Sequence, residues 1–145
     1  MPPVRVLFLC TGNSARSIIA EAMLRHLGGN SFDVRSAGVE PKGIHPMTLR
    51  VLADAGIDAT ELRSEHVDAY AGERFDHLIT LCDDAAERCP VFPGETRRIH
   101  WSLPDPAATS GDETARRDAF ERTRETLRTL ISEFIHGVAR SDAGR

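Results

Sequence analysis

The sequence is poor in the features that mark nucleic-acid-binding and membrane proteins. Only one lysine, Lys42, occurs in 145 residues, the formal net charge is −4, and aromatic residues make up 6%. The sequence therefore lacks the basic stripe with interleaved aromatic side chains that a nucleic-acid partner requires. The longest apolar run near the start, residues 6–10, is too short for a signal-peptide core or a membrane span. We expect a cytoplasmic protein with no nucleic-acid or membrane partner.

Cysteine is also scarce, with three residues at positions 10, 82 and 89. An odd number of cysteines in a reducing compartment points to catalytic or redox-active thiols rather than to structural disulfides. The hydrophobic content of 41% fits one globular domain with a sizeable core. We assign residues 1–138 to this domain and residues 139–145 to a short flexible tail.

Apolar runs typical of strands alternate with segments of helical spacing. Strands are expected at residues 4–9, 32–37, 76–81 and 97–101, with a helix after each and the last helix, 113–136, ending at Gly137. This alternation predicts an α/β fold, a parallel sheet with helices on both faces. Ligands of such sheets bind beyond the carboxyl ends of the strands. Cys10, Cys82 and Asp105 all follow predicted strands.

The run CTGNSARS, residues 10–17, follows the first predicted strand and has the composition of a loop wrapped around an anion. Loop N–H groups and the positive end of the next helix would face inward, and Arg16 can hold an oxyanion with its bidentate fork. The Ser17 hydroxyl is placed to hydrogen-bond the Cys10 sulfur, which favours the thiolate. The alternative is a buried structural cysteine beside a solvated arginine. The predicted oxyanion-binding residues are Thr11, Gly12, Asn13, Ser14, Ala15 and Arg16.

With this loop, the chain resembles the low-molecular-weight tyrosine phosphatase superfamily and, within it, the thioredoxin-coupled arsenate reductases. Three further motifs carry the resemblance: SAGVEPKG at 36–43, ITLCDDAAERCPVFPG at 79–94 and HWSLPDPA at 100–107. Together they cover most of the chain up to the final helix. The resemblance implies a single-domain, four-stranded sheet in the order 2-1-3-4, which would place Cys10 and Cys82 side by side.

Cys82 and Cys89 are too far apart on a helix to form a disulfide. Seven positions correspond to about 10.5 Å of helical rise, whereas the Cα atoms of a disulfide lie within about 7 Å. Bridging this pair therefore requires residues 83–88 to unwind, and their charged composition leaves little apolar burial to lose. The alternatives are two inert thiols or a zinc half-site, although metal-ligand pairs usually have shorter spacings.

Asp105 is the candidate general acid. An oxygen of bound arsenate must leave as water when sulfur attacks arsenic, and a nearby acid assists by protonating it. The ring of Pro106 favours an extended conformation at Asp105. A solvated loop aspartate is the alternative interpretation.

The resemblance implies that arsenate is reduced to arsenite by three cysteines. Cys10 attacks arsenate held by the loop and Arg16, with Asp105 as acid, and Cys82 then attacks Cys10 so that arsenite leaves. Finally Cys89 attacks Cys82, and thioredoxin reduces the resulting Cys82–Cys89 disulfide.

Two other functions use the same residues. A tyrosine phosphatase would need only Cys10, Arg16 and Asp105, but Ala107 and Ala108 stand where the phosphatases tend to carry aromatic residues. A thiol-based redox or arsenic sensor would use the cysteines without turnover.

The resemblance also raises the question of a potassium ion near the loop. In some relatives the positions of Asn13, Glu21 and Ser36 help to bind a monovalent cation, but Glu65 stands where an aspartate is expected. The residues themselves favour a loop-stiffening amide at Asn13 and a helix-surface charge at Glu21. We predict no other bound metal or cofactor.

Overall fold

A parallel four-stranded sheet forms the centre of the molecule. The computed structural model describes residues 2–143. The sheet has the order β2-β1-β3-β4, and each neighbouring pair is parallel. The α/β fold and the strand order predicted from the sequence are thus confirmed. The strands are β1 (Val4–Cys10), β2 (Phe32–Gly38), β3 (His77–Thr80) and β4 (Arg97–His100).

Strand β1 runs through the core, with β2 and β3 as its neighbours. Its residues Val6, Leu7, Phe8 and Leu9 are fully buried. A strand covered on both faces has no solvent side, which explains its unbroken apolar run. Cys10 is the last residue of this strand and is therefore fixed by the most buried part of the sheet.

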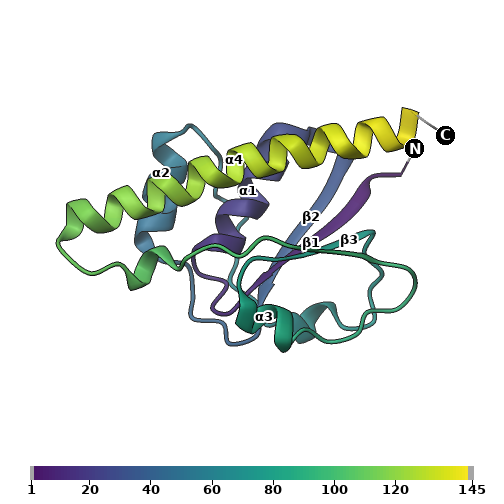
Figure 1. The fold of residues 1–145 in the computed structure, drawn as a ribbon, viewed down its shortest axis with the longest axis horizontal. Coiled ribbons are helices and arrows are strands. Elements are labelled where there is room, and N and C mark those ends of the chain that lie inside the picture. Colours follow the sequence, from purple (N-terminus) through teal and green to yellow (C-terminus); the bar gives the residue numbers. More distant parts are fainter. Residues whose placement is uncertain (1, 144–145) are drawn as a thin grey trace.

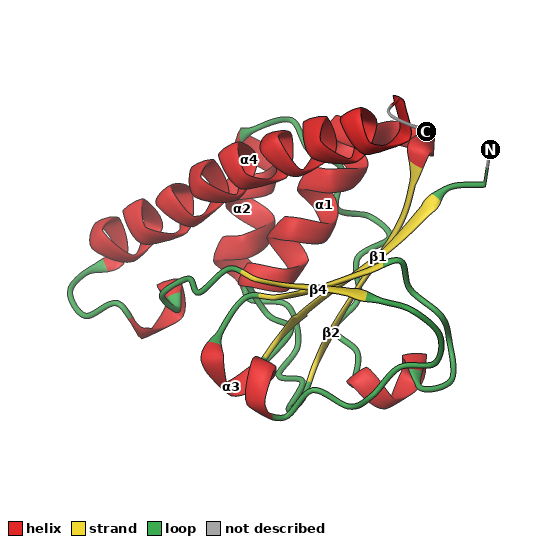
Figure 2. Ribbon diagram, turned by 45° about the vertical axis from the view of Figure 1, so that its right-hand side comes forward, coloured by secondary structure: helices red, strands yellow, loops and turns green. Residues whose placement is uncertain are grey.

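The helices are distributed over both faces of the sheet. Figures 1 and 2 show α1, α2 and α4 packed together on one side and the short α3 on the other. Within residues 2–143, none of the helices combines the length and the apolar character needed to span a membrane. The α-helices are α1 (Arg16–Gly28), α2 (Pro46–Asp54), α3 (Asp83–Glu87) and α4 (Glu113–Ala143), and the 3₁₀ turns are η1 (Gly29–Ser31), η2 (Val67–Tyr70) and η3 (Pro106–Ala108).

Helix α4 is longer than the sequence predicted. The expected end at Gly137 was wrong, because the helix continues to Ala143. A glycine inside a helix costs about 1 kcal/mol relative to alanine, and packing of Ile135 and Val138 against the core offsets this. Of the tail predicted at 139–145, residues 139–143 are helical, and residues 144 and 145 lie outside the described part.

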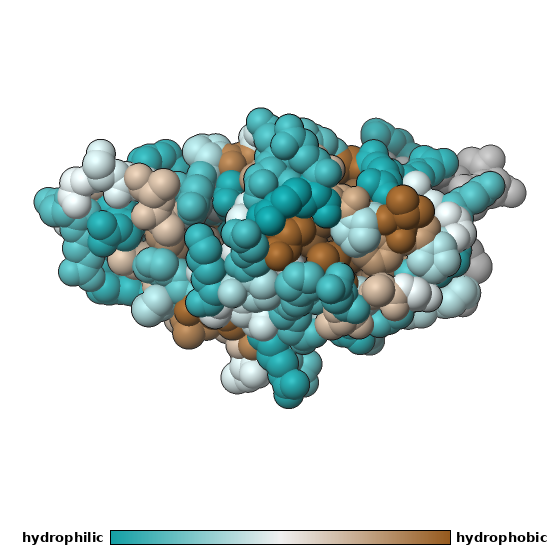
Figure 3. Space-filling view, turned by 90° about the horizontal axis from the view of Figure 1, so that it is seen from below, coloured by the Kyte–Doolittle hydropathy of each residue, from teal (hydrophilic) through white to brown (hydrophobic). Residues whose placement is uncertain are grey.

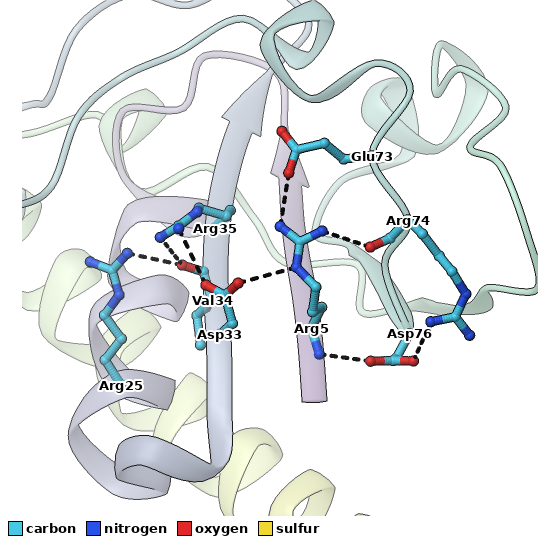
Figure 4. Close-up of polar contacts among 8 residues, drawn as sticks. All are labelled: Arg5, Arg25, Asp33, Val34, Arg35, Glu73, Arg74 and Asp76. Carbon is cyan, nitrogen blue, oxygen red and sulfur yellow. Dashed lines mark hydrogen bonds and ion pairs between the residues drawn. The ribbon is translucent and has the colours of Figure 1, made fainter. Parts of the chain in front are cut away.

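A network of charged side chains closes the amino end of the sheet, opposite Cys10 (Figure 4). The Arg5 guanidinium donates to Asp33 Oδ2 at 3.1 Å and to Glu73 Oε1 at 2.8 Å. It also stacks 4.6 Å from the centre of the Phe75 ring. The Arg5 amide donates to Asp76 at 2.8 Å. These contacts tie β1, β2 and the segment before β3 together at the end remote from the loop.

Candidate active site

The loop after β1 turns its carbonyl groups outward and its N–H groups inward. Because the C=O and N–H groups of the loop peptides project in opposite directions, carbonyls bonded on the outside leave the amides facing the centre. In the part of the chain that the structure describes, the amides of residues 11–15 donate to no protein acceptor. This is the arrangement of an oxyanion site. The carbonyls of Cys10, Thr11, Gly12 and Ser14 accept from the amides of Val39, Glu40, Lys42 and His45 at 3.3, 2.8, 2.9 and 3.1 Å.

Asn13 and Gly38 allow the loop to adopt this shape. Asn13 has φ of 45°, in the left-handed region that asparagine tolerates better than most residues. Gly38, at the end of β2, packs directly under the loop, where an added Cβ would lie 2.7 Å from the Thr11 carbonyl oxygen and 2.9 Å from the Asn13 amide. A larger residue at position 38 would displace the loop backbone.

The Ser17 hydroxyl lies 2.8 Å from the Cys10 sulfur, as the sequence predicted. Asn13 Nδ2 donates to Ser17 Oγ at 2.7 Å, and Asn13 Oδ1 accepts from the Glu65 amide at 2.7 Å, which fixes the orientation of the Asn13 amide. When Cys10 is a thiolate it has no proton to donate, so the Ser17 hydroxyl is then the donor to the sulfur. That donation stabilises negative charge on the nucleophile.

The same network continues away from Cys10 to Glu21. Asn13 Nδ2 also donates to Ser36 Oγ at 3.0 Å, and Ser36 donates to Glu21 Oε1 at 2.6 Å. Glu21 is only 4% exposed, so its interpretation as a helix-surface charge was wrong. Burial raises the pKa of the Glu21 carboxyl, and Ser36 and Arg25 oppose that rise. Arg25 lies 2.6 Å from Glu21 Oε2 and supplies the balancing charge.

Glu21, Ser36 and Glu65 line a cavity of about 370 Å³, the region in which potassium was considered. Burial, with the nearby Glu65, raises the pKa of Tyr70 at its edge to about 12. The Asn13 and Glu21 oxygens already accept hydrogen bonds from within the chain, and arginines also line the cavity. The function proposed below uses no bound cation.

Cys82 lies beside the loop, at the carboxyl end of β3. It is buried, and its sulfur is 3.3 Å from the Thr11 hydroxyl. It also precedes α3 as the cap residue, accepting from the Ala85 amide at 3.4 Å. The same Thr11 hydroxyl donates to Asp84 at 2.9 Å. Thr11 therefore links the anion loop to both Cys82 and the first turn of α3.

Cys89 lies beyond the other end of α3 and is half-buried. Its thiol donates to the Pro90 carbonyl at 3.3 Å, and Arg98 Nη1 is 3.7 Å from the sulfur. All three cysteines are free thiols. Helix α3 thus separates Cys89 from Cys82, as the seven-residue spacing predicted.

Arg16 lies at the start of α1, and Asp105 lies in the segment between β4 and η3. Arg16 Nη1 donates to the Leu103 carbonyl at 3.0 Å, which attaches the start of α1 to the segment carrying Asp105. The Asp105 carboxylate is exposed and accepts from the Ala107 amide at 3.0 Å. Among the described residues, no hydrogen bond joins Asp105 to Cys10. The bond between Arg16 and the Leu103 carbonyl is the contact that joins the segment before Asp105 to the start of α1.

Several contributors to the site were not found from the sequence. Segment 39–45 holds the loop carbonyls through its backbone, which leaves no side-chain pattern to detect. Thr11 was predicted only as a loop residue, although its side chain reaches Cys82. Exposed ion pairs also join Arg88 to Asp84 and Glu40. The charged residues at 83–88 were the available signal for these pairs.

Comparison with known proteins identifies the family of this chain. Residues 5–143 match the family described as low molecular weight phosphotyrosine protein phosphatase. A Bacillus licheniformis protein named arsenate reductase is 39% identical over 129 residues, which are 89% of this chain and 93% of that protein. The thioredoxin-dependent arsenate reductase of Corynebacterium glutamicum superposes with a TM-score of 0.68 at 29% identity, over 93% of this chain and 63% of that longer one. An arsenate reductase in its oxidised state gives 0.78 at 25% identity, over 95% of this chain and 99% of that one.

Proposed function

Because this chain belongs to the low molecular weight phosphotyrosine protein phosphatase family, we propose that it uses the oxyanion loop of this fold to reduce arsenate to arsenite. The contact between Thr11 and Cys82 is the main support. A phosphatase needs the loop, Cys10 and an acid, but has no use for a second thiol beside the loop. The relatives named arsenate reductase support the same substrate.

In the first step, the Cys10 sulfur attacks arsenic while the loop amides and Arg16 bind the remaining oxygens. An S–As bond forms, one As–O bond breaks, and the oxygen leaves as water after taking a proton from Asp105. Ser17 supports this step because its proton points to the attacking sulfur. Arsenic stays in its +5 state at this stage.

In the second step, Cys82 attacks the Cys10 sulfur. The S–As bond breaks and its electron pair remains on arsenic, so that As(V) becomes As(III) and arsenite is released. The two sulfurs are left as a Cys10–Cys82 disulfide. Neighbouring strand ends favour this step, since Leu9 and Thr80 are paired across β1 and β3 just before the two cysteines.

In the third step, Cys89 attacks Cys82 and releases Cys10 as a thiolate. This requires α3 to unwind, and the helix offers little resistance because only Ala85 is buried among its residues. The face that carries α3 is largely hydrophilic, with small apolar patches (Figure 3). The ion pairs on α3 are exposed, and such pairs contribute little to stability. Thioredoxin, a dithiol reductant, then reduces the Cys82–Cys89 disulfide.

Phosphotyrosine hydrolysis is the second candidate, favoured by the family itself and by the complete anion loop. After the Asp-Pro pair the chain has Ala107 and Ala108, both exposed. These small side chains supply no aromatic wall for a phenol ring. We therefore propose phosphatase activity only as a weak side reaction.

Coupled turnover tests this proposal. The full-length protein is mixed with thioredoxin, thioredoxin reductase and NADPH, and NADPH consumption is followed with and without arsenate. We expect arsenate-dependent consumption that is lost in Cys82→Ser, while that variant still hydrolyses p-nitrophenyl phosphate slowly. Absence of arsenate-dependent consumption, together with rapid phosphotyrosine hydrolysis, would favour the phosphatase instead.

A trapping experiment tests the order of the thiols. Cys89→Ser should reduce about one equivalent of arsenate and then stop, because its Cys10–Cys82 disulfide has no resolving partner. Peptide mapping by mass spectrometry should find that disulfide. Sustained turnover of Cys89→Ser with thioredoxin would contradict the three-step relay.

A further inference from the structure

The contact between β4 and the last cysteine has no part in the steps described so far. We infer that Arg98 activates Cys89, by holding its sulfur and stabilising the thiolate that attacks Cys82. This inference rests on the proposed function, since it concerns the third step of that relay. Arg98 lies outside the loop at residues 10–17, outside the Asp105 motif at residues 100–107 and outside α3.

The Arg98 guanidinium contacts the cysteine and the next residue at the same time. Its Nη1 lies 3.7 Å from Cys89 Sγ, and its Nη2 lies 3.3 Å from the Pro90 carbonyl oxygen. Two donors from one planar group fix the orientation of that group, which a single point charge would not do. The contact is therefore directed at the sulfur.

Cys89 needs such a contact because its surroundings otherwise oppose ionisation. Burial raises the pKa of the Cys89 thiol, while the charge and the hydrogen bond of Arg98 lower it. Thiol–disulfide exchange proceeds through the thiolate. The other arginine close in sequence, Arg88, is engaged with Asp84 and Glu40. Arg98 is the charged side chain that directly contacts the sulfur.

In the resting protein the Cys89 proton is donated to the Pro90 carbonyl. When that proton is lost to solvent, the sulfur becomes an acceptor only, and the Arg98 donor remains beside it. The thiolate then attacks Cys82 of the Cys10–Cys82 disulfide. The Cys82–Cys89 bond forms, the Cys10–Cys82 bond breaks, and its electron pair leaves with Cys10 as a thiolate. This exchange consumes no external oxidant.

Arg98 is located where it can act on Cys89 both before and after α3 unwinds. Strand β4 is paired with β3 through residues 77–80 and 97–100, so its backbone does not depend on α3. The Arg98 side chain is exposed, and its long aliphatic stem allows the guanidinium to follow the sulfur as segment 83–88 opens. Strand β4 thus carries the charge, and the segment that follows α3 carries the thiol.

Direct measurement of thiol reactivity tests the inference without arsenate. In a Cys10→Ser/Cys82→Ser background, Cys89 is the one remaining cysteine, and its alkylation by iodoacetamide is followed from about pH 6 to 10. One pKa unit changes the thiolate fraction about tenfold below the midpoint. We expect Arg98→Gln to slow alkylation at neutral pH by roughly three- to tenfold and to move the midpoint upward.

Two matched variants separate charge from structure. Arg98→Lys keeps the positive charge but loses the second donor to Pro90, so its rate should fall between those of the parent and Arg98→Gln. Arg97→Gln changes an exposed neighbour on the same strand and should leave the rate unchanged. At pH values above both midpoints, Arg98→Gln and the parent should react equally, which shows that access to the sulfur is the same. Identical midpoints and rates in Arg98→Gln and the parent would overturn the inference.

Measurement of arsenate turnover tests whether the contact between Arg98 and Cys89 contributes to the proposed reaction. In the otherwise unmodified chain, Arg98→Gln should slow arsenate-dependent NADPH consumption and accumulate the Cys10–Cys82 disulfide, as mass spectrometry would detect. If the unmodified chain consumes no NADPH with arsenate, the proposed function fails, but the alkylation experiment still decides the role of Arg98. Normal turnover by Arg98→Gln without that accumulation would count against the role in the relay.

Discussion

The Thr11 hydroxyl lies 3.3 Å from the Cys82 sulfur, although 71 positions separate the two residues in the sequence. The same hydroxyl donates its proton to Asp84 on α3. In the proposed relay α3 unwinds and Asp84 withdraws, which frees that proton to turn toward Cys82. One side chain therefore connects the loop after β1 to the helix that the proposed relay requires to open.

Thr11→Val keeps the shape of this side chain but removes the hydroxyl. We expect arsenate turnover to fall about five- to tenfold, as for the loss of one hydrogen bond of about 1 kcal/mol. Slow hydrolysis of p-nitrophenyl phosphate should persist, because the loop amides are untouched. An equal loss of both activities would indicate damage to the loop itself. The measurement is a comparison of the two steady-state rates.

Ser17→Ala removes the proton directed at Cys10. Hydrogen bonds to charged groups contribute about 1.5–3 kcal/mol, so alkylation of Cys10 by iodoacetate should slow roughly 10- to 100-fold in a Cys82→Ser/Cys89→Ser background. Ser36→Ala, which breaks the far end of the same network without touching Cys10, is the matched control and should have a smaller effect. Equal effects of the two substitutions would argue against a direct role for Ser17.

Arg88→Gln tests the unwinding of α3. The substitution removes the ion pairs to Asp84 and Glu40, which lie at 2.8 and 3.1 Å. Because both pairs are exposed and weak, we expect oxidation of the Cys82–Cys89 pair by diamide to accelerate only about two- to threefold. Arg122→Gln, on the exposed face of α4, is the control. Slower oxidation in Arg88→Gln would show that the helix does not limit the reaction.

His77 should make the fold sensitive to acid. It is half-buried against Phe134, with ring centres 4.9 Å apart, and burial lowers its pKa below the ordinary value of 6.5. As pH falls, the unfolded chain takes up a proton at this position before the folded chain does, so the free energy of unfolding decreases. The stabilising effect is present above about pH 6.5 and is lost as pH falls through the lower, folded pKa.

His77→Phe keeps an aromatic ring and removes the titration. Urea unfolding between about pH 7.5 and 5 should therefore show a smaller loss of stability in His77→Phe than in the parent. His136→Gln, at an exposed position of α4, should follow the parent. Parallel curves for His77→Phe and the parent would contradict the assignment to His77.

The sequence predicted the features that depend on local patterns. The unbroken apolar run before Cys10 identified β1, and the composition of residues 10–17 predicted the loop that follows it. A helix was also expected after the third predicted strand, and α3 lies there, between Cys82 and Cys89. Each of these features depends on neighbouring residues, for which periodicity and turn chemistry are sufficient.

The features that were not predicted depend on contacts between segments that are far apart in the sequence. Gly137 is a common helix terminator, but packing of Val138 against the core extends α4 beyond it. In the sequence Glu21 is typical of a surface charge on a helix. Only the folded chain places Ser36 and Arg25 beside its carboxylate. Arg98 approaches Cys89 only because β4 lies next to the end of α3. Tertiary packing decided all three cases.

The position of β4 at the margin of the sheet has a consequence for protein handling. Its outer hydrogen-bonding groups have no neighbouring strand, and such margins can recruit strands from other molecules. Arg97 and Arg98 are exposed along it, and charge on an edge opposes such recruitment. Neutralising both together should promote self-association, so the Arg98 variants are best compared one substitution at a time.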